Sequence, residues 1–196
     1  MIDGLVAALV GLALGVVTGM PLGVVNVAVA DAAAAGQRRF ATAIGLGGAL
    51  ADSVHAALAF IGIGRVVVSR PDWTHPLAII AAAVIAAYVA LSLSRRKSEV
   101  RSPKSGVPGV LAGLALTLPN PAALAAWVAV AAALWPTIAV PAAIVLAAGV
   151  GVGSALWFAA LARWVTVSPR AGRAIARVGL ALMLAIAAVG LVRALA

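Results

Sequence analysis

Residues 11–36, GLALGVVTGMPLGVVNVAVADAAAAG, form a long apolar stretch that Pro21 and Gly23 interrupt halfway along. A proline inside a helix removes one backbone hydrogen bond and clashes with the preceding turn. The stretch therefore predicts one long helix that is broken near its middle. In a membrane, the backbone groups freed by such a break need other partners, so a broken helix is expected to line a polar cavity.

The same design recurs in the second half of the chain. Residues 109–134 read GVLAGLALTLPNPAALAAWVAVAAAL, with an interruption at residues 119–121, Pro-Asn-Pro. The two stretches align without a gap, as Gly11 with Gly109, Gly15 with Gly113, Pro21 with Pro119 and Gly23 with Pro121. Two broken apolar helices at corresponding places in two halves are typical of the binding site of a secondary transporter.

The composition indicates an integral membrane protein. Of the 196 residues, 65% are hydrophobic and 10% are charged, and the mean hydropathy is +1.18. Soluble domains are about 45–50% apolar and about 25% charged. The formal net charge is +9, but the basic residues lie between the apolar runs, where they set topology and meet anionic headgroups. We therefore expect membrane lipid, and not nucleic acid, as their partner.

Several kinds of site are excluded or disfavoured. The chain has no cysteine, which excludes disulfides and thiolate metal ligands. It also has no Walker-type phosphate-binding motif and no paired-histidine metal spacing, so we predict no ATP site, no cofactor and no metal. A hydrolase triad would have to come from one buried helix turn, so the chain is not expected to be an enzyme.

Six apolar segments are each long enough to cross a bilayer as a helix of about 20 residues. The predicted fold class is an all-α membrane protein with six transmembrane helices in two inverted three-helix repeats, helices 1 and 4 being broken at Pro. The predicted helices span residues 3–35, 40–64, 75–94, 108–134, 138–164 and 174–195. Residues 65–73 predict a short loop, in which Trp73 anchors at a membrane interface.

The chain divides into three regions. Residues 1–94 form the first three-helix repeat, residues 95–107 a basic cytoplasmic linker, and residues 108–196 the second three-helix repeat. The linker, RRKSEVRSPKSGV, is the only strongly hydrophilic stretch in the sequence, and it reads as a connection between halves rather than as a domain.

The distribution of basic residues predicts the orientation. Loops 1–2, 3–4 and 5–6 are much more basic than the opposite side, which has only Arg65, Arg70 and Arg193. The basic residues of the first side are Arg38, Arg39, Arg95, Arg96, Lys97, Arg101, Lys104, Arg163, Arg170, Arg173 and Arg177. The positive-inside rule places these loops in the cytoplasm of a bacterial inner membrane, with both termini outside. Because three helices per half is an odd number, the second half enters from the opposite side, which predicts an inverted repeat.

Asp52 is the sharpest single candidate for a site residue. It lies in the middle of the second predicted helix, with mainly apolar residues on both sides. A carboxyl group inside the membrane is costly and usually has a partner or a task, here as a proton carrier or as the counter-charge of a substrate ammonium group. Ser53 and His55 flank it, and His55 shares its helix face. The alternatives are a proton relay and a hydrogen-bonded structural histidine. Asp31 is expected to be interfacial or capping.

The helix breaks supply the other candidates, which are Pro21, Gly23, Pro119 and Pro121, together with Asn120 and Asn26. Amides at the start of a half-helix can hold a carboxylate, and freed carbonyls can hold an ammonium group. The two asparagines either contact substrate, cap a half-helix or bridge two helices. Trp127 and Trp157 lie inside predicted helices, where an aromatic ring can stack on a cation, but we expect each of them to pack in the core.

Local sequences resemble a known family. In the first half these are residues 20–23 (MPLG), 36–39 (GQRR) and 48–52 (GALAD). In the second half they are residues 118–122 (LPNPA), followed by Trp127. With the length, the six apolar segments and the central basic linker, they resemble the lysine exporter (LysE/RhtB) superfamily of bacterial amino-acid exporters over essentially the whole chain. The second proline of the family's Pro-Gly-Pro break is absent, and Ala122 replaces the usual lysine, so no role of that lysine is carried over.

The resemblance implies export of amino acids or similar small metabolites, driven by the proton-motive force and without ATP. We therefore predict a secondary-active exporter, working by proton-coupled antiport and alternating access. Its expected partners are a small-molecule substrate, protons, membrane lipid and a second copy in a homodimer. The alternatives are a metal or inorganic-ion exporter of a related six-helix family and a non-transporting membrane assembly subunit.

Overall fold

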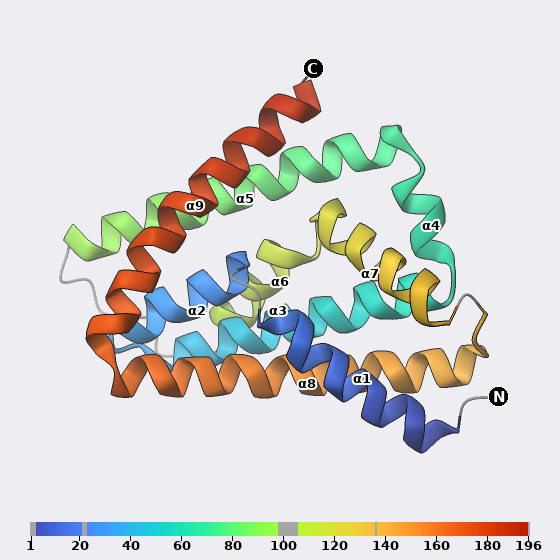
Figure 1. The fold of residues 1–196 in the computed structure, drawn as a ribbon. Helices are drawn as coiled ribbons and strands as arrows, with labels where there is room; N and C mark the ends of the chain where they lie inside the picture. The colour runs from blue at the N-terminus through green and yellow to red at the C-terminus, as the bar shows by residue number, and fades with distance from the viewer. Residues whose placement is uncertain (1–2, 21–22, 98–105, 136, 196) are drawn as a thin grey trace.

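The computed structural model describes residues 3–20, 23–97, 106–135 and 137–195. Within these ranges the regular elements are all α-helices, which confirms the predicted all-α class. Figure 1 shows how the helices are arranged. In chain order they are α1 (Gly4–Gly19), α2 (Val24–Ala34), α3 (Arg38–Phe60), α4 (Ile63–Val68), α5 (Pro71–Lys97), α6 (Val107–Thr117), α7 (Pro121–Leu134), α8 (Val140–Val167) and α9 (Pro169–Leu195).

Both predicted helix breaks are present. The first broken helix consists of α1 and α2, whose axes differ by 70°, and the second consists of α6 and α7, whose axes differ by 71°. Pro21 lies outside the described residues. At the second break, Pro121 is the first residue of α7, a position where the missing N–H of proline has no helical partner to lose.

The segment between the second and third predicted spans differs from the prediction. Residues 65–73 are not a loop, because α4 covers Arg65 and α5 already begins at Pro71. The chain turns into α4 at Gly62, whose φ of 90° lies in the left-handed region that glycine adopts without strain. Asp72 in the first turn of α5 faces the positive end of the helix dipole, which favours an early helix start. Trp73 is 53% exposed.

Close helix packing depends on glycine. An added Cβ at Gly11 or Gly15 of α1 would collide with the backbone of Leu146 or Val150 in α8. In the other half, an added Cβ at Gly113 of α6 would collide with the backbone of Ile44 in α3. Small residues allow such backbone contact between membrane helices. The first helix of each broken pair is therefore packed against the long helix of the other half.

The same contacts give the relative directions of these helices. Along α1, Gly11 and Gly15 meet α8 in ascending order, so α1 and α8 run parallel. Along α6, Gly109 meets Phe40 and Gly113 meets Ile44, so α6 and α3 also run parallel. The helices α3 and α8 run antiparallel, since Gly45 meets Phe158 whereas Ser53 bonds to Ala147. It follows that α1 and α6 point in opposite directions.

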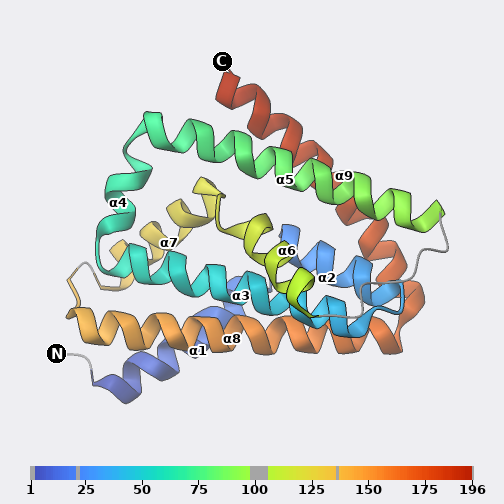
Figure 2. The ribbon, with the colours of Figure 1, turned by 180° about the vertical axis from the view of Figure 1, so that it is seen from behind.

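The junctions between helices gather at two ends of the bundle. Figures 1 and 2 show the α2–α3 and α8–α9 turns and the end of α5 at one end. The start of α1, the α3–α4–α5 connection and the α7–α8 connection lie at the opposite end. The long helices α3 and α8 lie side by side between these ends in both views.

Length and composition identify membrane spans among the described residues. The helices α3 and α8 are each long and apolar enough to cross a membrane, and the count rises to four if each bent pair forms one span. In α5 the apolar part, Ile79–Leu91, is shorter. Large apolar side chains point outward on these helices, such as Leu9 at 58% and Val152 at 53% exposure. A surface of this kind fits a lipid environment. The division into six spans remains a prediction.

Candidate functional site

The middle of α3 carries the candidate residues Asp52, Ser53 and His55, and Gly151 of α8 lies against Ser53. Three buried glycines earlier on the same helix let α3 approach three different helices: Gly45 faces α8, Gly47 faces α6 and Gly48 faces α2. Ser53 contacts α8 directly: its hydroxyl donates a hydrogen bond of 2.7 Å to the carbonyl of Ala147. Ser53 thus holds α3 and α8 in register.

His55 connects α3 to the second helix break. Its side chain is 2% exposed, and Nε2 lies 3.1 Å from the carbonyl oxygen of Leu118, the C-cap residue of α6. A carbonyl oxygen only accepts hydrogen bonds, so Nε2 is the protonated ring nitrogen. In a helix interior the carbonyl of Leu118 would accept from the next turn, but the break removes that donor. His55 replaces it.

Asp52 faces the other half of the bundle. The hydroxyl of Ser154 in α8 lies near the Asp52 carboxyl group. The same hydroxyl donates a hydrogen bond of 3.2 Å to the carbonyl of Gly15 in α1. Ser154 is fully buried, whereas Asp52 is partly buried. A single hydroxyl proton serves one acceptor at a time, and here the Gly15 carbonyl is that acceptor.

Asn26 bridges the first helix break. Its Nδ2 donates a hydrogen bond of 2.8 Å to the carbonyl of Gly19, the last residue of α1. Its Oδ1 accepts a hydrogen bond of 2.9 Å from the indole Nε1–H of Trp157 in α8. Among the roles left open by the sequence, the geometry is that of a bridge between helices. An added Cβ at Gly19 would lie 2.9 Å from Cδ1 of Trp157, so glycine at this position lets the indole ring pack closely against the end of α1.

Asn120 caps the second half-helix. It is the N-cap of α7, where its Oδ1 accepts a hydrogen bond of 3.0 Å from the backbone N–H of Ala122. Pro119 and Asn120 are partly buried. At the first break Gly23 is the N-cap of α2 and makes no side-chain cap. The start of α2 is therefore left without the cap that α7 has.

Trp127 packs in the core. It is 5% exposed and belongs to an apolar cluster that includes Ala56, Phe60 and Leu146 from α3 and α8. Asp31 is also buried, at 8% exposure inside α2, in contrast to an exposed interfacial position.

The structure brings most candidate residues to the middle of the bundle. Asp52 and His55 lie one turn apart on α3, the first beside the α1–α8 contact and the second at the α6–α7 break. Within the described ranges, no group of three or more His, Cys, Asp or Glu side chains is placed to hold a metal ion. The arrangement offers one carboxyl group, one imidazole and several helix-end carbonyls, which suits proton exchange and binding of a small polar molecule.

Sequence reasoning missed two contributors and assigned a third to the core. Ser154 is an isolated polar residue in a glycine-rich apolar helix, a signal that could have marked it. Thr117 directly precedes the second break and is 6% exposed. Threonine is common in membrane helices, so its presence in the sequence did not mark it as a site residue. Trp157 was expected to pack in the core, yet its indole bonds to Asn26.

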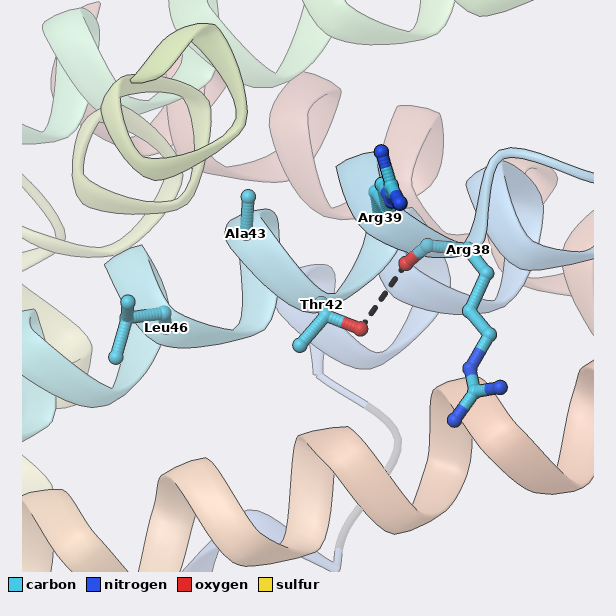
Figure 3. A pocket seen from close by; sticks show the side chains of 5 residues that line it. All are labelled: Arg38, Arg39, Thr42, Ala43 and Leu46. Carbon is cyan, nitrogen blue, oxygen red and sulfur yellow. Dashed lines mark hydrogen bonds between the residues drawn. The ribbon is translucent and has the colours of Figure 1, made fainter. Parts of the chain in front are cut away.

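A surface cavity lies away from these residues, at the start of α3. It has a volume of about 600 Å³ and is lined by Arg38, Arg39, Thr42, Ala43 and Leu46. Figure 3 shows that the two arginine side chains point in different directions, and that the Thr42 hydroxyl bonds back to the Arg38 carbonyl at 3.0 Å. None of the predicted site residues lines this cavity.

Comparison with known proteins agrees with the geometry. A family model described as LysE type translocator matches residues 16–195, from the end of α1 to the end of α9. Neither the curated proteins nor the solved structures gave a match. The matched region contains both helix breaks, the middle of α3 and the apolar helices able to cross a membrane. This multi-pass membrane protein belongs to the LysE type translocator family.

Proposed function

We propose that this protein exports amino acids or similar small metabolites from the cytoplasm in exchange for protons. One observation carries the proposal: α3 holds Asp52 and His55 one turn apart, between two broken helices. Ionisable side chains inside a membrane protein are costly and mark ion or substrate paths. Broken helices in two halves supply the polar backbone groups that bind a substrate there.

Two inverted repeats explain the reciprocal packing. Gly15 of α1 meets Val150 of α8, and the aligned Gly113 of α6 meets Ile44 of α3. The long helices contribute matching glycines as well. Gly153 of α8 meets Leu12 of α1, and Gly47 of α3 meets Val110 of α6. Together with the opposite directions of α1 and α6, these matched contacts support a two-fold relation between the halves. Such a relation provides inward-open and outward-open states of similar energy, as alternating access requires.

Asp52 is the group that we assign to proton exchange. When ionised, it offers a negative charge beside the broken helices and attracts a substrate ammonium group. When protonated, it loses that charge, which favours release. A ligand shifts a conformational equilibrium only by its differential affinity for the two states. The Ser154 hydroxyl, which bonds to Gly15 of α1 and lies near Asp52, supplies a physical link between the charge and the position of α1.

The orientation follows from the charges. The end of the bundle with the α2–α3 turn, the end of α5 and the α8–α9 turn has most of the basic residues. We place this end in the cytoplasm of a bacterial inner membrane. Substrate would then enter from the side of Arg38 and Arg39.

Transport in proteoliposomes tests the proposal. Purified protein is reconstituted, a pH gradient is imposed, and uptake of radiolabelled amino acids is measured over a range of pH. We expect Asp52→Asn to abolish gradient-driven uptake, while Asp72→Asn, at the start of α5, keeps it. If Asp52→Asn still moves substrate against a gradient with normal pH dependence, the proposed coupling is wrong.

A further inference from the structure

Two buried polar atoms meet the end of α6 without a partner. His55 Nδ1 and Thr117 Oγ1 have no hydrogen-bond partner among the residues that the structure describes, and their side chains are 2% and 6% exposed. They come from different helices, yet His55 bonds to the carbonyl of Leu118, the residue that follows Thr117. A buried polar atom left unpaired costs about 1–3 kcal/mol. Two such atoms beside the same helix end need an explanation, and a polar ligand that binds there would supply one.

Thr117 departs from the behaviour of other helical threonines in this chain. Thr18, Thr42 and Thr166 each donate to the carbonyl four residues earlier, at 2.7, 3.0 and 2.7 Å. These three side chains are exposed, whereas Thr117 is buried and makes no such bond. Its hydroxyl is therefore free to donate to or accept from another group at the break.

The chemistry of the surrounding groups selects a cationic donor. Since Nε2 of His55 carries the ring proton, Nδ1 of the neutral ring presents a lone pair. The C-terminal end of α6 contributes a partial negative charge. Asp52 lies one turn before His55 on α3, beside the α1–α8 contact, and its carboxyl group adds negative charge in the same region of the bundle. A carboxylate would be repelled by all three groups, whereas an ammonium group fits them.

We propose that His55 Nδ1 and Thr117 Oγ1 form a subsite that binds the primary ammonium group of the substrate at the α6–α7 break. The proposal rests on the proposed function, because it takes this break as part of the substrate path. In it, the Leu118 carbonyl fixes the ring so that Nδ1 accepts one ammonium hydrogen, and Thr117 Oγ1 accepts a second. Thr117 thereby becomes a substrate-binding residue.

Nitrogen NMR of the imidazole ring tests the subsite directly. The chain has two histidines, so the His75→Gln variant leaves His55 as the single reporter. The full-length protein, with ¹⁵N-labelled histidine, is studied in lipid nanodiscs. We expect the resonances of a neutral ring with Nε2 protonated and Nδ1 bare. A ring protonated on Nδ1 would overturn the proposal.

Three small molecules of equal carbon number then test which charge the subsite prefers. They are propylammonium chloride, sodium propionate and 1-propanol. We expect propylammonium alone to shift the Nδ1 resonance. Thr117→Val should weaken its apparent affinity at least about tenfold, because a hydrogen bond to a charged group is lost, while Thr117→Ser keeps it. A shift with propionate instead, no shift with any probe, or full affinity in Thr117→Val would each overturn the assignment. The measurement uses no gradient, so its failure is distinct from a failure of proton-driven transport.

Discussion

The indole Nε1–H of Trp157 donates a hydrogen bond of 2.9 Å to Oδ1 of Asn26. The same Asn26 side chain donates to the carbonyl of Gly19, which the helix break leaves without a helical partner. One amide group thus joins the end of α1, the start of α2 and the middle of α8. At the second break His55 has the corresponding role, because its Nε2–H donates to the carbonyl of Leu118.

Asn26→Leu should destabilise the protein, because it leaves both the Gly19 carbonyl and the Trp157 N–H unpaired in a buried site. The expected loss is about 1–3 kcal/mol for each stranded group, seen as a lower melting temperature of the purified protein in detergent. Trp157→Phe removes only the second bond and should cost less. In the double variant the two effects should not add, since both remove the same contact. Strictly additive effects would contradict the bridge.

Gly15→Ala and Gly113→Ala should each destabilise the fold, because the new methyl group collides with the backbone of α8 or α3. Overpacking of this kind costs about 1–3 kcal/mol. Gly4→Ala is the matched control, since nothing lies within 4 Å of an added Cβ there. Thermal melting of the three variants checks the prediction. Equal melting temperatures for Gly15→Ala and Gly4→Ala would show that α1 and α8 are not in backbone contact.

Asn120→Ala should remove the N-cap of α7 and cost about 0.5–2 kcal/mol of stability. Asn120→Ser keeps a capping oxygen and should retain most of that stability. The pair also separates two roles, since transport by a stable Asn120→Ser protein reports on substrate contact alone. Normal transport in that variant would limit Asn120 to capping, and a loss of transport at normal stability would assign it to the substrate.

Cysteine labelling tests the orientation in intact cells, because the chain has no cysteine of its own. Ala35→Cys lies in the α2–α3 turn and Thr137→Cys in the α7–α8 connection, and both positions are exposed. A membrane-impermeant maleimide should label Thr137→Cys from outside, and Ala35→Cys only after permeabilisation. The opposite pattern would reverse the assigned topology.

Some of the site could be read from the sequence. The breaks at residues 20–23 and 118–120 follow from proline, whose effect on a helix is local. Asp52 stands out because a carboxyl group in an apolar helix is rare. The two helical segments within residues 65–73, the end of α4 and the start of α5, could not be foreseen, because Arg, Pro and Asp there suggest a loop when read without the turn at Gly62. Trp157 looked like a core residue, because its partner Asn26 lies far away in the chain.

The sequence by itself determined that the chain is a helical membrane protein with two matched helix breaks. Composition, apolar run length and proline position are properties of short segments, so they need no tertiary information. Only the tertiary structure decided which side chain meets each break: Asn26 and Trp157 at Gly19, and His55 at Leu118. It also left Thr117 Oγ1 without a partner. These relations depend on the rotation and register of helices that are distant in the chain, and glycine contacts between backbones set both.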